Sequence, residues 1–248
     1  MKKLLAALVA LSLFLGCGCA SPSPEIPSWT SSPAPQQPEV PSGEVPEDAA
    51  QGTPAESPPA ETPEAVPEPA DSDFVNVADY IPTILVDLAY AGTENCTGQA
   101  IYEFTDAYLR YGTVKKLSAA QEQLASQGFG LLIWDAFRPT AAQFKLWEVC
   151  PDPVYVANPE KGFSSHSRGN TVDVTLVTLE GNNVEMPTAF DDFTPLADRD
   201  YSDVDPVPAA NAKLLEDTMA ACGFTPYQGE WWHFSDSETY DVEENFSP

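Results

Sequence analysis

The composition of residues 21–72 limits which part of this chain can form a folded domain. It holds 14 of the 25 prolines, many acidic residues, and neither lysine nor arginine. Proline removes backbone donors and like charges repel, so such a segment cannot build a packed core. We therefore expect residues 21–72 to form a disordered, acidic, proline-rich tether. The folded part should lie within residues 73–248, which is long enough for one globular domain with its own core.

Residues 1–20 have the pattern of an export signal. Two lysines precede a short apolar core, residues 4–15, which is too short to cross a bilayer as a permanent helix. The core ends at Phe14-Leu15-Gly16-Cys17, a pattern typical of the cleavage site of bacterial lipoproteins. We expect lipidation of Cys17, with Cys19 as the less favoured acceptor and a plain secretory signal as the alternative. The protein would then be exported and lipid-anchored to the outer face of the bacterial cell membrane, with no other membrane contact.

The formal net charge of −27 argues against a nucleic-acid partner, because a polyanion would be repelled and no basic stripe is visible. Within residues 73–248, apolar periodicity and turn residues predict an α+β domain, with a small antiparallel sheet packed by helices and no βαβ repeat. The expected helices are 113–127, 140–149 (capped by Thr140) and 208–221, and the expected strands are 83–89, 129–134, 171–178, 184–186 (a hairpin after the 180–183 turn) and 224–234.

Three cysteines fall in this domain: Cys96, Cys150 and Cys222. An exported domain can form disulfides, and three cysteines allow at most one internal pair. Cys96 with Cys150 is the candidate pair, and the absence of any disulfide is an equal alternative. Their wide spacing does not indicate a metal site.

The chain has only two histidines, and each lies in a context that suits a metal site. His166 lies in a Ser/Gly-rich loop, and Asp173 follows seven residues later in an otherwise apolar strand. Val172, Val174 and Leu176 would face one side of that strand, leaving Asp173 on the other. An unpaired carboxylate is costly to bury there, and a bound metal removes that cost. The alternative is a capped surface loop followed by a surface Asp.

The second histidine, His233, ends the segment Gly229-Glu230-Trp231-Trp232-His233. In a regular strand Glu230 and His233 would face opposite sides. Gly229 suggests a bend or bulge that returns Glu230 to the side of His233. His166, Asp173 and His233 could then supply the three ligands that a zinc hydrolase needs, with Glu230 as the general base and the zinc site on the sheet. The alternative is an edge strand with a surface Glu and a core His.

Arg138 follows an expected strand and precedes Pro139. An arginine fixed by a rigid turn can hold an oxyanion or a carboxylate by paired hydrogen bonds. An ion pair with the neighbouring Asp135 explains the same pattern equally well.

Several segments, in order, resemble the bacterial zinc D-alanyl-D-alanine dipeptidases, the group that includes the vancomycin-resistance dipeptidase. The matching segments are Asp87-Leu88-Ala89-Tyr90-Ala91, Asn95-Cys96-Thr97-Gly98, Tyr108-Leu109-Arg110, Trp134-Asp135-Ala136-Phe137-Arg138-Pro139, Ser164-Ser165-His166-Ser167-Arg168-Gly169, Val172-Asp173-Val174-Thr175-Leu176, Phe190-Asp191 and Glu230-Trp231-Trp232-His233-Phe234.

The resemblance implies one Zn²⁺ per chain, bound by His166, Asp173 and His233. It also implies that Glu230 is the catalytic base, that Arg138 stabilises the transition state, and that Ser164 helps to hold a small D,D-peptide substrate.

Two departures from the family pattern stand out. Cys96 replaces the usual Phe, and Leu196-Ala197-Asp198-Arg199 lacks a Ser-His pair that often follows the Phe-Asp segment. The second departure could alter the rim of the pocket and so the size of the substrate.

Three functions are compatible with the sequence. The first is hydrolysis of free D-Ala-D-Ala to two D-Ala, favoured by the Trp231-Trp232-His233 segment. The second is a D,D-carboxypeptidase that trims terminal D-Ala from peptidoglycan stem peptides, favoured by export because the stems lie outside the cell. The third is a non-catalytic, zinc-stabilised, cell-wall-binding lipoprotein, which would need neither Glu230 nor Arg138.

Overall fold

The computed structural model describes residues 67–153 and 156–248. The expected export signal, Cys17 and most of the expected tether lie outside these ranges. The last residues of that tether are bonded to the domain, since Gly112 N–H donates to Asp71 O (3.0 Å) and Arg110 Nη1 to Ser72 O (2.7 Å). Within the described ranges, no helix has the length and apolar character needed to cross a bilayer.

The larger sheet of the described residues has five strands in the order β2-β4-β5-β7-β6. Neighbouring strands are antiparallel except β2 and β4, which are parallel. The predicted α+β class is confirmed, and the parallel edge pair is the departure from a purely antiparallel sheet. A two-stranded antiparallel ladder joins β1 to β3. The strands are β1 (Phe74–Asn76), β2 (Leu85–Val86), β3 (Tyr108–Arg110), β4 (Phe129–Asp135), β5 (Thr171–Thr178), β6 (Phe224–Pro226) and β7 (His233–Asp236).

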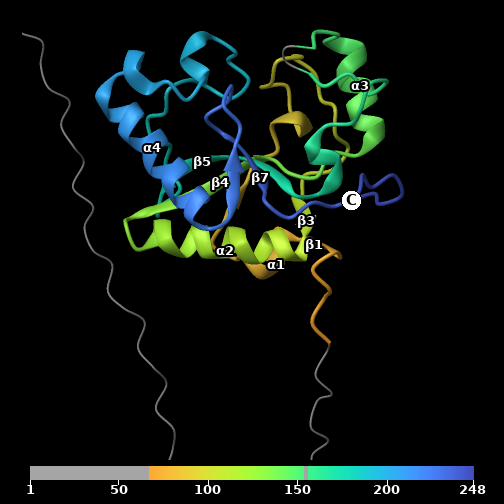
Figure 1. Ribbon diagram of the computed structural model, residues 1–248, viewed down its shortest axis with the longest axis horizontal. Coiled ribbons are helices and arrows are strands. Elements are labelled where there is room, and N and C mark those ends of the chain that lie inside the picture. The colour runs from red at the N-terminus through yellow and green to blue at the C-terminus, as the bar shows by residue number, and fades with distance from the viewer. Residues whose placement is uncertain (1–66, 154–155) are drawn as a thin grey trace, which may run out of the picture. The chain divides into compact units, whose positions relative to one another are not determined.

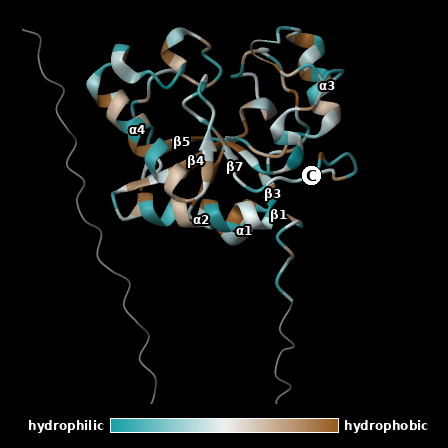
Figure 2. Cartoon of the chain, in the orientation of Figure 1, coloured by the Kyte–Doolittle hydropathy of each residue, from teal (hydrophilic) through white to brown (hydrophobic). Residues whose placement is uncertain are grey.

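Two long helices cover one face of this sheet. α2 (Tyr111–Ala125) packs on β4 and on α4 (Pro206–Ala221), which also contacts β5 and β6. Figure 1 shows α2 beneath the strands, with α3 (Thr140–Val149) at the far end from most of α4 and the short α1 (Val77–Tyr80) beside α2. Hydrophobic and hydrophilic residues are mixed along α2 (Figure 2), as expected of a helix with one face in the core and one in water.

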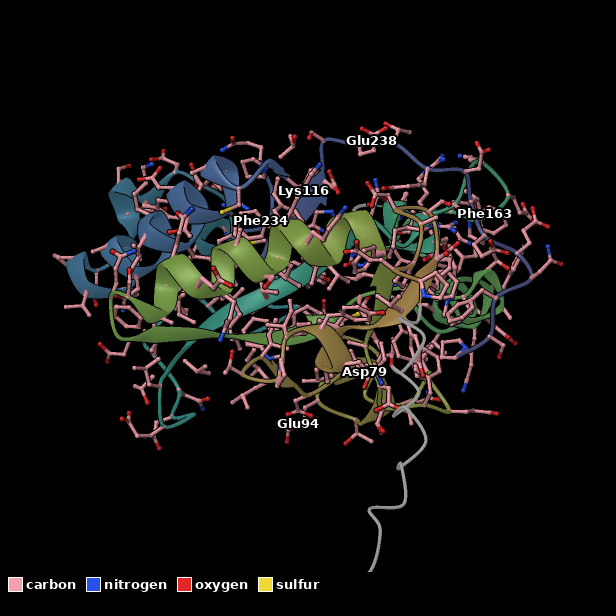
Figure 3. All side chains as sticks on the ribbon, turned by 90° about the horizontal axis from the view of Figure 1, so that it is seen from below. Asp79, Glu94, Lys116, Phe163, Phe234 and Glu238 are labelled. Carbon is pink, nitrogen blue, oxygen red and sulfur yellow. The ribbon has the colours of Figure 1, made fainter. Side chains whose placement is uncertain are left out.

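The opposite face of the sheet carries a row of ionisable side chains. Asp236 points toward α2, where it pairs with Lys116 and accepts a hydrogen bond from Thr113 Oγ1 (2.9 Å); Figure 3 shows Lys116 on this helix. Side chains alternate along a strand, so His233 points away from α2. In the strand register His233 lies opposite Asp173, and Asp173 lies opposite Asp135. Neighbouring strands thus bring Asp135, Asp173 and His233 side by side on the face that is free of α2.

Two expected strands differ in extent. The 83–89 strand is reduced to β2, because the chain then enters a 3-10 turn, Ala89–Ala91, that buries Tyr90. The 224–234 strand is divided into β6 and β7, which form a hairpin around the loop that contains Glu230.

Smaller differences concern helix and hairpin ends. The helices expected at 113–127 and 208–221 are observed at Tyr111–Ala125 and Pro206–Ala221. Thr140 is the first residue of α3, and Pro139 holds the cap position without a side-chain bond. The hairpin after β5 is limited to a single bridge, Val177 with Asn183.

The three cysteines of the described part are free thiols, so the candidate Cys96–Cys150 pair is not formed. Burial raises the pKa of Cys96 to about 12, with the Asp191 carboxylate adding to the shift. Cys96 is therefore a thiol, not a thiolate, at neutral pH.

We predict that Gly169→Ala destabilises the fold more than Gly128→Ala. Both glycines have positive φ (+76° and +87°), which costs an alanine about 1–2 kcal/mol. A Cβ on Gly169 would also lie 2.3 Å from Cε1 of Phe74, whereas one on Gly128 meets nothing within 4 Å. Overpacking of this kind costs about 1–3 kcal/mol more. Urea denaturation measures both losses, and equal losses would contradict this account of the Gly169 turn.

Candidate metal centre

Three side chains from separate elements meet on the free face of the sheet. His166 comes from the 3-10 turn Ser165–Arg168, Asp173 from β5 and His233 from the start of β7. His166 Nε2 lies 3.4 Å from Asp173 Oδ2 and 3.4 Å from His233 Nδ1, and His233 Nδ1 lies 3.0 Å from Asp173 Oδ1. All three can offer ligand atoms within 4.8 Å of one another. The structure thus brings together the residues that the sequence predicted as ligands.

The His166 ring is held in the orientation that a ligand requires. Its Nδ1 lies 2.8 Å from Ala136 O, an acceptor only, so Nδ1 carries the proton. In the neutral imidazole Nε2 then presents its lone pair to Asp173 and His233. At the start of the same turn the side chain of Ser164 accepts from His166 N–H (3.3 Å), and at its end Gly169 takes a left-handed conformation.

The Asp173 carboxylate is the most constrained group of the set. It is 3% exposed, and its Oδ1 has no hydrogen-bond partner in the described residues although His233 Nδ1 is 3.0 Å away. Burial opposes ionisation, yet the two imidazoles hold the pKa of Asp173 well below its usual range. An ionised, buried carboxylate beside two imidazoles is a donor set that suits Zn²⁺.

Glu230 lies in the loop before β7, and its carboxylate is 17% exposed. A turn brings it to the side of His233, since His233 N–H donates to Glu230 O (3.3 Å) and Glu230 Oε2 lies 3.5 Å from His233 Nδ1. The sequence predicted this return but attributed it to a bend within a strand. Burial, followed by the charge of Asp173, raises the pKa of Glu230 to about 8.

Arg138 is buried and held on several sides. Nη2 and Nε donate to Asp135 Oδ2 (2.6 and 3.2 Å), and Nη1 donates to Gln143 Oε1 (3.0 Å). Its guanidinium carbon lies 5.0 Å from the centroid of the Tyr90 ring. Burial alone would lower the pKa of Arg138, but the Asp135 carboxylate outweighs it and holds the pKa above the usual range. The two roles predicted for Arg138, an ion pair with Asp135 and an anion-binding group, are therefore compatible. The ion pair holds the positive guanidinium at the site.

These side chains share a cavity of ≈ 340 Å³. Its walls include His166, Asp173, His233, Glu230, Arg138 and Ser164, together with Tyr90, Asp191 and the aromatic residues Phe163, Phe193, Tyr227 and Trp232. A metal-ligand set, a carboxylate with a raised pKa and a fixed guanidinium in one cavity suit hydrolysis of an amide.

Comparison with known proteins agrees with this chemistry. The family model for D-ala-D-ala dipeptidase matches residues 70–247. The chain belongs to the D-Ala-D-Ala dipeptidase family of metallopeptidases. It is 36% identical to the D-alanyl-D-alanine dipeptidase of Escherichia coli K12 over 163 residues (66% of this chain, 84% of that protein). It is 37% identical to that of Streptomyces coelicolor over 191 residues (66% and 91%), and 33% identical to that of Enterococcus faecium over 168 residues (60% and 83%).

Two cavity residues of this family member received no role from the sequence. Asp191 is half-buried, has φ +58°, and accepts hydrogen bonds from Tyr90 OH (3.0 Å) and Cys96 N–H (3.0 Å). Both Tyr90 and Asp191 fall within segments that carry the family resemblance, which was the available signal. Positive φ is uncommon in non-glycine residues and clusters at functional sites, which makes Asp191 a candidate for a role in the cavity.

We predict that Asp173→Asn weakens Zn²⁺ binding by more than the roughly 100-fold that loss of an outer-shell partner costs. The amide keeps the shape of the carboxylate but loses the charge that the cation requires. Calorimetric titration of the metal-free protein measures the effect, and the exposed Asp192→Asn serves as the matched control. Unchanged affinity in Asp173→Asn would remove this residue from the site.

Proposed function

We propose that the protein hydrolyses the D-Ala-D-Ala dipeptide to two D-Ala, using one Zn²⁺ held by His166, Asp173 and His233. The observation that carries the proposal is that these three residues, Glu230 and Arg138 line one cavity of ≈ 340 Å³. Family membership supports it, because the relatives compared above are named as dipeptidases for this substrate. A bound zinc ion would supply Lewis acidity for the scissile carbonyl and an acidified water molecule.

Glu230 acts as the general base in this proposal. Its carboxylate takes a proton from the attacking water and returns it to the leaving amine. A carboxyl group with a raised pKa can perform both transfers near neutral pH, and a nearby cation lowers that pKa from its metal-free value of about 8.

Arg138 stabilises the negative charge that develops on the carbonyl oxygen. Asp135 and Gln143 each engage one side of its guanidinium, which leaves a second hydrogen on each terminal nitrogen for a substrate oxygen. Because the guanidinium is already held in place, little reorganisation is needed during the reaction.

The two charged ends of a free dipeptide need partners in the cavity. We assign its ammonium group to Asp191, a half-buried carboxylate of the cavity wall whose pKa is raised by burial. Ser164 also lines the cavity, and we assign it the role of helping to hold the substrate.

One observation favours the second candidate, a D,D-carboxypeptidase acting on longer stem peptides. A groove of ≈ 940 Å³ adjoins the cavity at Asp191 and could hold a longer chain. The proposed export of the protein would place it beside such stems. A non-catalytic wall-binding role does not explain why Glu230 and Arg138 lie in the cavity of the metal ligands.

We predict that Glu230→Gln retains zinc binding and lowers turnover of D-Ala-D-Ala by about 10²–10⁴-fold, the range expected for loss of a general base. Release of D-Ala by the full-length, zinc-loaded protein is the measurement. Glu180→Gln, an exposed change in the turn after β5, is the matched control and should be as active as the wild type.

The same assay separates the candidates. Hydrolysis of the dipeptide but not of a pentapeptide stem supports the dipeptidase, and the reverse result supports the carboxypeptidase. Wild-type turnover by Glu230→Gln would contradict the mechanism for both.

We also propose that the protein is exported and lipid-anchored through Cys17, as the first 20 residues predict. Cys17→Ala should abolish incorporation of a labelled fatty acid into the protein in the producing bacterium, whereas Cys19→Ala should not. Labelling that survives Cys17→Ala and disappears with Cys19→Ala would move the anchor to Cys19.

A further inference from the structure

The guanidinium of Arg199 donates hydrogen bonds to five acceptors within the protein. It lies in the segment where the chain lacks the Ser-His pair of the family pattern, and its side chain is only 3% exposed. A guanidinium has five N–H groups, and here five acceptors face them. The acceptors are Tyr227 O (2.7 Å, from Nε), Glu230 O and His233 O (both 3.0 Å, from Nη2), and Tyr201 OH (3.3 Å) and Glu216 Oε2 (3.1 Å, both from Nη1).

Three of these acceptors are backbone carbonyls of residues 227–233, which comprise the loop between β6 and β7 and the first residue of β7 and are called the 227–233 loop below. The backbone N–H of Arg199 also donates into this region, to Gln228 O (3.1 Å). The loop is short, contains Gly229, and carries both Glu230 and His233. Within the loop, His233 N–H donates to Glu230 O (3.3 Å), Glu230 N–H to Tyr227 O (3.4 Å) and Tyr227 N–H to His233 O (3.1 Å).

The other side of the guanidinium is anchored on the scaffold. Glu216 belongs to α4, and the Phe234 ring, which is fully buried in β7, lies 4.6 Å from the guanidinium carbon. Among the described residues, Glu230 and His233 line the cavity but Arg199 does not. Arg199 thus connects the back of the loop to α4 and β7 and has no contact with the substrate space.

We propose that Arg199 is a positioning residue that fixes the 227–233 loop and thereby sets the places of the Glu230 carboxylate and the His233 imidazole. The inference rests on the proposed function for the roles of Glu230 and His233. The bonds to Glu230 O and His233 O come from the two hydrogens of a single nitrogen, so they fix the spacing of these two residues directly. The planar guanidinium can donate to several separate carbonyls at once, whereas the compact ammonium group of a lysine cannot reach all of them.

The test is the Zn²⁺ affinity of Arg199→Met and Arg199→Lys in the full-length protein, measured by competition with a chromophoric chelator. We expect both variants to bind zinc about 10–100-fold more weakly, the usual cost of losing an outer-shell partner. Lys keeps the charge opposite Glu216 but cannot span the three carbonyls, so it should not rescue the affinity. In the Co²⁺-substituted protein, the visible spectrum should change because the His233 ligand has moved.

Gln121→Met is the matched control for general loss of stability. Gln121 is also buried and also bridges backbone groups, Thr83 O (3.2 Å) and Leu131 N–H (2.8 Å), but it lies on α2, on the other side of the sheet from the metal ligands. It should lower the melting temperature without changing zinc affinity or the cobalt spectrum.

Wild-type zinc affinity in Arg199→Met, or an equal loss in Gln121→Met, would overturn the inference. Full rescue by Arg199→Lys would also overturn it, since charge alone would then be sufficient. If Arg199→Met does not fold, the folded Arg199→Lys variant decides the question by the same measurements.

These measurements need no substrate, so a protein that binds zinc but does not cleave D-Ala-D-Ala would refute the proposed function and leave the role of Arg199 in the metal site testable. Where turnover is measurable, kcat should fall while KM stays near the wild-type value, because Arg199 does not contact the substrate.

Discussion

The buried carboxylate of Asp173 is the constraint on which the site depends. It is buried between two imidazoles, and its Oδ1 has no hydrogen-bond partner among the described residues, so its charge is costly there without a further partner. A divalent cation at the meeting point of the three side chains would resolve this conflict. The strand register maintains the arrangement, since a slip of one residue between β5 and β7 would turn His233 to the face of α2.

Asp135, the neighbour of Asp173 in the same row, has a different partner and a different task. Its carboxylate binds Arg138 and accepts a hydrogen bond from Tyr102 OH (2.6 Å), so its charge is compensated within the protein. Gln143 completes this arrangement by joining Arg138 to Ala157 O (2.7 Å) in the cavity wall. The surroundings thus distinguish the two carboxylates of this row. Asp173 lies between two imidazoles as the candidate metal ligand, and Asp135 is paired with a fixed guanidinium.

The parts of the site that the sequence predicted are those in which local pattern and chemistry coincide. Asp173 could be assigned because it interrupts an apolar strand, and His166 because it stands in a Ser/Gly-rich loop shortly before it. Glu230 was assigned correctly to the side of His233, but the sequence did not reveal that a loop between two strands brings it there. A strand pattern alone cannot distinguish a bulge from a hairpin loop when the segment is this short.

The contacts that the sequence could not predict join residues far apart in the chain. Arg199 bonds to a loop about thirty residues later, and Tyr90 bonds to Asp191 about a hundred residues later. Such pairs depend on how the elements pack and leave no local periodicity. The extent of β2 was missed for a similar reason, because the turn that ends it is stabilised by burial of Tyr90 and not by a residue that breaks strands.

X-ray absorption at the zinc edge of the zinc-loaded protein tests the central claim most directly. The account predicts only nitrogen and oxygen neighbours at about 2.0–2.2 Å, with the outer-shell scattering of two imidazole rings. A sulfur neighbour at about 2.3 Å would place a cysteine in the metal site. That result, or the scattering of fewer than two imidazoles, would contradict the assignment of His166, Asp173 and His233 as the ligands.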